Sequence, residues 1–222
     1  ITQIYASFGG GDPVQDFTTI HTIYKKNNNS FRGTSLQKNF EIFRQTFPAI
    51  DGIDMDCEDY YDTRKDKFNS FAAFCEMMIE MGFDITFCPY ERPDFWVAML
   101  RRLLVSYSNR VKWWNLQCYD GGDGNKPEQW ASAIKKAIPW FPTKRFILVG
   151  DWNRFYDAER KRWRGRCPQM VTKHISPFKQ QASFGGGFIW QMDAILNPGR
   201  DMAHSGCGSN EVGMKDYSEA IQ

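Results

Sequence analysis

Three carboxylates alternate along one short apolar stretch, Ile50 to Asp59. In an extended chain, residues two apart point to the same side, so Asp54, Asp56 and Glu58 form one row and the apolar residues between them face the other way. Such a row costs stability, because like charges repel and buried carboxylates lose hydration. The same crowding raises the pKa of one carboxyl, which can then hold a proton at neutral pH while a neighbour stays ionised. The row therefore predicts acid–base chemistry at the end of a strand.

The sequence Asp-Gly-Ile-Asp-Met-Asp-Cys-Glu at positions 51–58 resembles the D-G-x-D-x-D-x-E signature of family 18 glycoside hydrolases, the chitinases and endo-β-N-acetylglucosaminidases. Other interpretations of the same residues are a solvated acidic turn and a metal-binding loop after a strand. The choice among them depends on whether the family's remaining motifs follow in order.

The chain around this row alternates between strand and helix patterns. We expect strands at 2–8, 50–59, 84–90, 111–119, 146–150 and 185–193, and helices at about 68–81, 93–104 and 216–221. Apolar residues at helical spacing mark two more helices, one at Phe40, Phe43 and Phe47 and one at Trp130, Ile134 and Ile138. Repeated strand–helix units predict a parallel α/β fold. Acids and aromatics at the carboxyl ends of strands favour a TIM (β/α)8-type barrel.

The number of units falls short of a complete barrel. We find about six strand–helix units, whereas the barrel needs eight. By the resemblance, these six match family strands three to eight, so residues 1–222 are expected to form a single catalytic barrel domain that lacks the first two βα units. A trimmed fragment, a second polypeptide that supplies the missing strands, or an open barrel would account for this. The first two are favoured, because an open edge exposes unpaired backbone.

Three further motifs follow the family's order. Ser-Phe-Gly-Gly at 7–10 resembles the S-x-G-G end of a barrel strand, where Gly9 and Gly10 let the backbone run close beneath the sugar. A phosphate loop is the other interpretation of these glycines, but no Gly-Lys-Ser/Thr follows. Gln-Cys-Tyr-Asp at 117–120 resembles the tyrosine motif of the sixth strand. Gly-Gly-Phe-Ile-Trp at 186–190 resembles the tryptophan motif of the eighth.

The resemblance implies retaining hydrolysis assisted by the substrate. Glu58 would protonate the glycosidic oxygen, and the sugar's own N-acetyl oxygen would attack the anomeric carbon to give an oxazolinium ion. Asp56 would orient the acetamide, with Asp54 behind it sharing a proton.

The resemblance also implies a set of substrate-binding residues. Tyr119 would donate a hydrogen bond to the acetamide oxygen and Trp190 would form an apolar floor beneath the sugar. Taken alone, either residue is more often part of a barrel core, and only their order behind the acidic strand favours the binding role. The other expected substrate-binding residues are Gln117, Asp120, Gly9 and Gly10.

Composition bounds the remaining possibilities. The 222 residues are 42% hydrophobic and 16% aromatic, enough for a large core, and the net charge of +2 gives no argument for nucleic acid as a partner. No apolar run approaches the roughly 20 residues that span a bilayer, so no membrane partner is expected. The basic segment 152–166 could contact an anionic polymer, but interspersed acids favour a solvated loop or helix face.

No cofactor and no metal are expected. The loop 120–125 could bind calcium, yet it lacks EF-hand spacing and a glycine-rich turn is the preferred interpretation. His21, His174 and His204 lack metal-ligand spacing and receive no role.

The six cysteines fall into two groups. Cys57, Cys75, Cys88 and Cys118 lie in predicted strands or an apolar helix, where a free thiol packs as a small hydrophobe. Only Cys167 and Cys207 are in loop-like sequence and free to pair. The cysteines thus leave the redox compartment undecided, and the glycosylation sequon at 28–30 tips the expectation slightly toward an extracellular protein. If the protein is secreted, this is a processed form, since 1–6 reads as a strand and lacks signal-peptide features.

The expected partner is an N-acetylglucosamine polymer or glycan. A chitinase-like hydrolase is preferred, with two alternatives: an endo-β-N-acetylglucosaminidase acting on N-glycans, and a non-catalytic carbohydrate-binding or structural protein on the same barrel. Proteins of this fold that have lost catalysis usually lack the glutamate, whereas Glu58 is present here.

Overall fold

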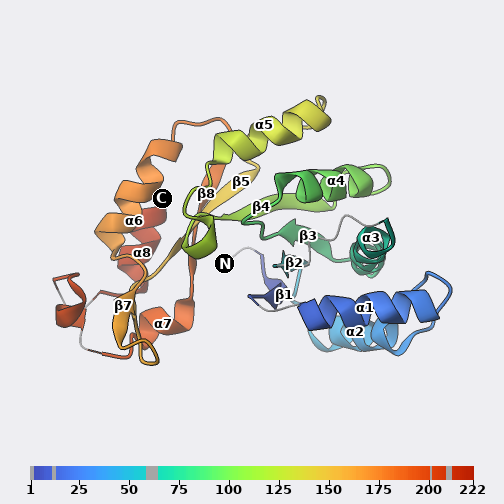
Figure 1. Cartoon of the computed structure of the whole chain (residues 1–222), viewed down its shortest axis with the longest axis horizontal. Coiled ribbons are helices and arrows are strands. Elements are labelled where there is room, and N and C mark those ends of the chain that lie inside the picture. The colour runs from blue at the N-terminus through green and yellow to red at the C-terminus, as the bar shows by residue number, and fades with distance from the viewer. Residues whose placement is uncertain (1–2, 12–13, 59–64, 201, 209–211) are drawn as a thin grey trace. The chain divides into compact units, whose positions relative to one another are not determined.

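The computed structural model describes residues 3–11, 14–58, 65–200, 202–208 and 212–222. Strands and helices alternate along most of this part of the chain (Figure 1). The chain divides into two compact units, each described by itself below. The first unit comprises Ile1–Trp114 with Ala133–Pro139, and the second comprises Asn115–Ser132 with Trp140–Gln222.

The first unit is built on parallel strands. Its elements are β1 (Tyr5–Gly10), α1 (Val14–Lys26), α2 (Ser35–Thr46), β2 (Gly52–Cys57), α3 (Lys65–Glu80), β3 (Asp84–Phe87) and α4 (Pro93–Leu104). β4 (Val111–Gln117) begins here and ends in the second unit. β2 lies between β1 and β3, with Gly9 opposite Asp56 and Asp54 opposite Thr86. This register decides which side chains surround the acids.

Aromatic side chains fill the core of the first unit. Phe87 of β3 packs against Trp96 of α4 with ring centroids 5.2 Å apart, and both are fully buried. α4 begins at Pro93, where the missing N–H of proline costs no helical hydrogen bond. Its apolar face then buries against the sheet, so the predicted helix 93–104 is confirmed at both ends.

The second unit has a parallel pair of strands and an antiparallel hairpin. β5 (Ile147–Trp152) pairs with β8 (Phe184–Trp190), and β6 (Phe155–Asp157) pairs with β7 (Arg162–Arg164). Its helices are α6 (Pro168–Ile175), α7 (Met192–Leu196) and α8 (Met214–Ile221), with short 3-10 turns at Asp120–Gly122, Ser176–Phe178 and Met202–Ser205. α5 (Pro127–Ala137) begins in this unit and ends in the first.

The cysteines behave as the sequence predicts. Cys167 and Cys207 form a disulfide with Cα atoms 5.5 Å apart, and Met202 packs beside it in a small apolar cluster. The other four cysteines are free and buried. The disulfide therefore ties the residue before α6 to the residues that follow the 3-10 turn at Met202–Ser205.

The sheet confirms the predicted fold class. Six strands follow the order β1-β2-β3-β4-β5-β8 among the described residues, and every register that is resolved between them is parallel. Helices alternate with the strands, as in an α/β fold. The single domain, and the absence of two βα units relative to a complete barrel, stay predictions. Within the described ranges, no helix has the length and apolar character needed to cross a membrane.

Candidate functional site

The acidic row lies at the carboxyl end of β2. Ile53, Met55 and Cys57 are buried, whereas Asp56 and Glu58 on the alternate positions are partly exposed. A strand that alternates in this way presents its acids together because its side chains have a period of two. The predicted row is therefore present, and it combines apolar anchoring with accessible carboxylates.

Asp54 is the innermost acid of the row. Its Oδ1 accepts a hydrogen bond of 2.5 Å from Thr86 Oγ1 on β3, and its Oδ2 accepts one of 3.4 Å from Ser7 Oγ on β1. Two hydroxyl donors from the neighbouring strands thus hold a carboxylate that is only 9% exposed. These two donors fix the orientation of the Asp54 carboxylate.

Asp56 is strongly perturbed. Burial, then repulsion from Glu58 and from Asp54, raises its pKa from 3.8 to about 8, and a hydrogen bond with Glu58 contributes to the rise. A carboxyl in this setting keeps its proton at neutral pH, because burial and the neighbouring carboxylates disfavour its charged form. Asp56 can therefore give up or accept a proton near neutrality, as acid–base catalysis requires.

Gly9 lets β1 approach the acidic row closely. A Cβ placed on Gly9 would lie 1.9 Å from the carbonyl oxygen of Asp56, and its φ of +113° is one that other residues rarely adopt. Gly10 also has a positive φ, but a Cβ there would meet nothing within 4 Å. The two predicted glycines thus differ: Gly9 has a packing constraint as well as a backbone one.

Aromatic rings gather in the second unit where β4, β5 and β8 end. Tyr119 stacks on Trp190 with ring centroids 5.9 Å apart and planes 9° apart, and Trp152 lies 5.1 Å from Trp190. Tyr119 and Trp152 are buried, whereas Trp190 is 41% exposed. An exposed aromatic face backed by buried rings is suited to the apolar face of a sugar.

Gln117 and Asp120 flank Tyr119. Gln117 is buried at the end of β4, and its backbone carbonyl accepts a hydrogen bond of 2.8 Å from Asn125 Nδ2. Asp120 begins a 3-10 turn with its side chain 61% exposed, and its carboxylate forms a 2.9 Å ion pair with Arg164. These contacts shape the loop that carries Tyr119.

The predicted site residues fall into two groups. Asp54, Asp56, Glu58, Gly9 and Gly10 are brought together in the first unit, and Gln117, Tyr119, Asp120 and Trp190 belong to the second. That both groups serve one substrate stays a prediction.

One polar cluster was missed by the sequence analysis. Asp151, with no exposed surface, accepts hydrogen bonds of 2.6 Å from Arg166 Nη1 and 2.7 Å from the backbone N–H of Trp152, and its Oδ2 lies 2.8 Å from His174 Nδ1. Its signal was an acid directly after the apolar strand 146–150. The sequence gives no sign of a role for His174, because its partner Asp151 lies 23 residues away.

The basic segment 152–166 was predicted wrongly as a solvated loop or helix face. It forms the β6–β7 hairpin, and several of its arginines bind within the second unit. Arg160 and Arg164 pair with Asp157, and Arg166 pairs with Asp151 and Asp123. Asp120 and Asp123 of the glycine-rich loop are thus partners of arginines, and no group of three potential metal ligands occurs among the described residues.

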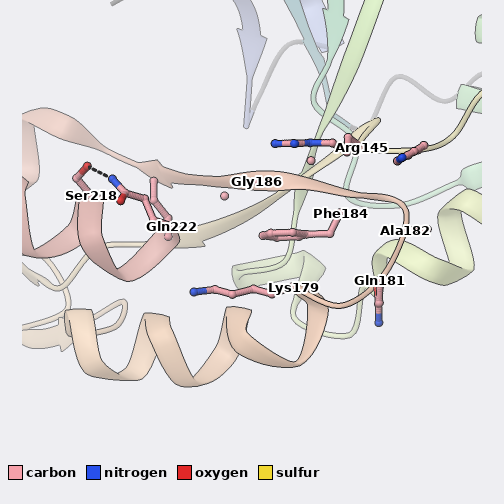
Figure 2. Close-up of a pocket in the computed structure, with 12 residues that line it drawn as sticks. Arg145, Lys179, Gln181, Ala182, Phe184, Gly186, Ser218 and Gln222 are labelled. Carbon is pink, nitrogen blue, oxygen red and sulfur yellow. Dashed lines mark hydrogen bonds between the residues drawn. The ribbon is translucent and has the colours of Figure 1, made fainter.

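A hollow of about 610 Å³ lies elsewhere in the second unit, near the start of β8. Figure 2 shows Arg145 and Lys179 on either side of Phe184, with Ser218 and Gln222 of the α8 segment nearby. Tyr119 and Trp190 lie at the opposite, carboxyl ends of their strands. We therefore do not assign this hollow to the candidate site.

Comparisons with known proteins bear on the fold. No family model matches the chain, and no curated protein matches it. Among solved structures, a GH18 chitinase from Pseudoalteromonas aurantia is similar with a TM-score of 0.59 and 18% identity, over 89% of this chain and 73% of that one. The catalytic domain of a family GH18 chitinase from the fern Peteris ryukyuensis gives a TM-score of 0.54 and 16% identity, over 98% and 72%. At these identities the likeness shows the fold, so the chain has the α/β architecture of GH18 chitinases, as its sequence predicts.

Proposed function

We propose that this chain is a glycoside hydrolase that cleaves β-1,4 linkages in N-acetylglucosamine-containing glycans, with Glu58 as the general acid. The observation that carries the proposal is the contact between Asp56 and Glu58 in the acidic row, where burial and repulsion from Glu58 and Asp54 raise the pKa of Asp56 to about 8. The similarity to GH18 chitinases supports it at the level of fold. Chitin-like polymers are the proposed substrate class.

In the proposed reaction, Glu58 gives its proton to the glycosidic oxygen as the bond from that oxygen to the anomeric carbon breaks. The acetamide oxygen of the same sugar bonds to the anomeric carbon and forms an oxazolinium ion. Water then attacks the anomeric carbon and gives a proton to the Glu58 carboxylate. The bond from this carbon to the acetamide oxygen breaks, which opens the oxazolinium ring and restores the acetamide. The two inversions leave the product with the β configuration of the substrate.

The neighbouring residues have supporting roles in this proposal. Asp56 orients the acetamide and offsets the positive charge of the oxazolinium ion, while Asp54 exchanges charge with it. Tyr119 donates a hydrogen bond to the acetamide oxygen, and Trp190 forms the floor beneath the sugar. The hydroxyls of Ser7 and Thr86 hold Asp54, which keeps the row in register during the cycle.

The test is product release from an N-acetylglucosamine pentamer, followed by NMR soon enough to observe the anomers before they equilibrate. We expect the wild type to release shorter β-anomeric oligomers. Glu58→Gln keeps the shape of the side chain but has no proton to give, so turnover should fall by about 100-fold or more. Unchanged turnover in Glu58→Gln, or an α-anomeric first product, would overturn the assignment.

We further propose that the protein works in an oxidising, extracellular setting. The Cys167–Cys207 disulfide supports this, since such bonds persist outside the reducing cytosol. Asn28 of the sequon is exposed in the turn after α1, where a glycan could be attached.

A further inference from the structure

A small arginine-lined pocket lies beside the aromatic cluster of the second unit. Its volume is about 300 Å³, at the lower end of the range for ligand sites. It is formed by residues that follow β4, by residues at the end of β5 and by residues of the β6–β7 hairpin. Its lining includes three aromatic residues, four arginines and two aspartates: Tyr119, Trp152, Trp163, Arg154, Arg162, Arg164, Arg166, Asp120 and Asp123.

The pocket adjoins the ring proposed to bind the sugar. Tyr119 and Trp152 line the pocket, and both also pack against Trp190. The guanidinium of Arg164 lies 4.4 Å from the centre of the Trp152 ring, which holds this cation over the aromatic wall. A sugar attached to one seated on Trp190 could therefore place a substituent among the arginines.

Two of the four arginines have an acidic partner in the lining. Arg164 pairs with Asp120 at 2.9 Å and Arg166 pairs with Asp123 at 2.8 Å. Both aspartate side chains are more than half exposed, and ion pairs at such positions contribute little stability. Each of these arginines also pairs with a buried acid, Arg164 with Asp157 and Arg166 with Asp151. An anion on a ligand could therefore compete only for the guanidinium donors that face Asp120 and Asp123.

The other two arginines have no ion-pair partner among the described residues. Arg154 bonds to neutral acceptors: its Nε and Nη2 donate to the Ser205 carbonyl at 3.1 and 2.9 Å, and its Nη1 donates to the Gly165 carbonyl at 2.9 Å. Burial lowers the pKa of Arg154, as expected for a cation that has lost water without gaining an anion. Arg162, at the start of β7, is exposed at the rim.

This combination differs from what a neutral chitin chain needs. Aromatic walls suit the apolar face of any sugar, whereas guanidinium groups without acidic partners favour a ligand that carries negative charge. We propose that this pocket is a subsite for an anionic substituent, a sulfate ester or a carboxylate, on an N-acetylglucosamine-containing glycan. The inference rests on the proposed function for the type of sugar and adds the charge of the substrate.

Binding tests this independently of turnover. In the Glu58→Gln background, which should prevent cleavage, the affinity is measured for three pentamers of N-acetylglucosamine: unmodified, 6-O-sulfated and 6-O-carboxymethylated. We expect at least one anionic pentamer to bind about tenfold more tightly than the neutral one, because a charge-assisted hydrogen bond contributes that much. The preference should shrink as salt is raised. The two anionic probes distinguish a sulfate site from a carboxylate site.

A matched pair of variants locates the preference. Arg162→Gln removes a rim charge and should reduce the ratio of anionic to neutral affinity several-fold. Lys161→Asn removes an equal charge from the neighbouring position outside the pocket lining, and asparagine tolerates the positive φ of Lys161, so the ratio should stay as it was. Circular dichroism checks that both variants fold.

The outcomes separate this inference from the proposed function. Equal affinity for all three pentamers, or an equal loss of preference in Lys161→Asn and Arg162→Gln, overturns the anionic subsite. If the wild type cleaves no pentamer while the preference and its dependence on Arg162 hold, the hydrolase assignment fails and the subsite stands.

Discussion

At the scale of single residues, Asp56 links chemistry to stability. Its folded pKa of about 8 lies above the usual 3.8, so the folded state holds a proton that the unfolded chain releases between these values. The resulting stability is fully present below about pH 4 and is lost as pH rises toward 8. The residue that makes the site reactive is thus also a liability at neutral pH, as expected for a functional carboxyl.

Asp56→Asn should remove this pH dependence. Asparagine is nearly the same size and stays uncharged, so the free energy of unfolding of wild type relative to the variant should fall with rising pH. The slope should be at most about 1.4 kcal/mol per pH unit, the limit for one proton. Denaturant titrations of both proteins at intervals from pH 4 to 8 measure it. Parallel curves for the two proteins would mean that Asp56 does not hold the extra proton.

At the scale of elements, the spacing of β1 and β2 depends on Gly9. In Gly9→Ala the new methyl group would collide with the Asp56 carbonyl and force the strands apart, beyond the cost of the positive φ. We expect a loss of about 2 kcal/mol or more in stability, with lower activity because the acidic row moves.

Gly10→Ala is the control for that variant. It carries a similar backbone strain, since φ is +126°, but its methyl group meets nothing within 4 Å. Thermal denaturation and pentamer turnover should therefore be affected less in Gly10→Ala than in Gly9→Ala. Equal effects in the two variants would show that strain alone, and not the contact with Asp56, explains the glycine.

Elements that depend on local pattern were predictable from the sequence. The Asp54–Asp56–Glu58 row could be recognised because β2 carries two of the acids and the third follows it directly in the sequence. Helix α4 could be recognised because Pro93 and a regular apolar face mark it. The β6–β7 hairpin was missed because its arginines looked solvated, while their partners, such as Asp120 and Asp151, lie far away in the sequence. The contact between Asp151 and His174 could not be predicted either, because these residues are also far apart in the sequence.

At the scale of the whole molecule, the two units differ in the state of their cysteines. The first unit contains only free cysteines in the described part of the chain, all of them packed as apolar side chains, whereas the second contains the disulfide. Forming or reducing the disulfide therefore changes the covalent structure of the second unit only. The effect of a reductant on thermal stability can be measured.

Reduction should destabilise the protein through Cys167–Cys207 alone. The bridge closes a loop with a sequence separation of 40, for which the chain-entropy estimate is a loss of about 4 kcal/mol when the bridge opens. The Tm of the wild type should fall in dithiothreitol, and the Cys167→Ser/Cys207→Ser variant should start lower and not respond to the reductant. Cys118→Ala, which changes a free buried thiol in the same unit, should still respond. A wild-type Tm that is the same with and without reductant would mean that the bridge contributes nothing to stability. A response in the double variant would trace the effect of the reductant to some group other than this pair.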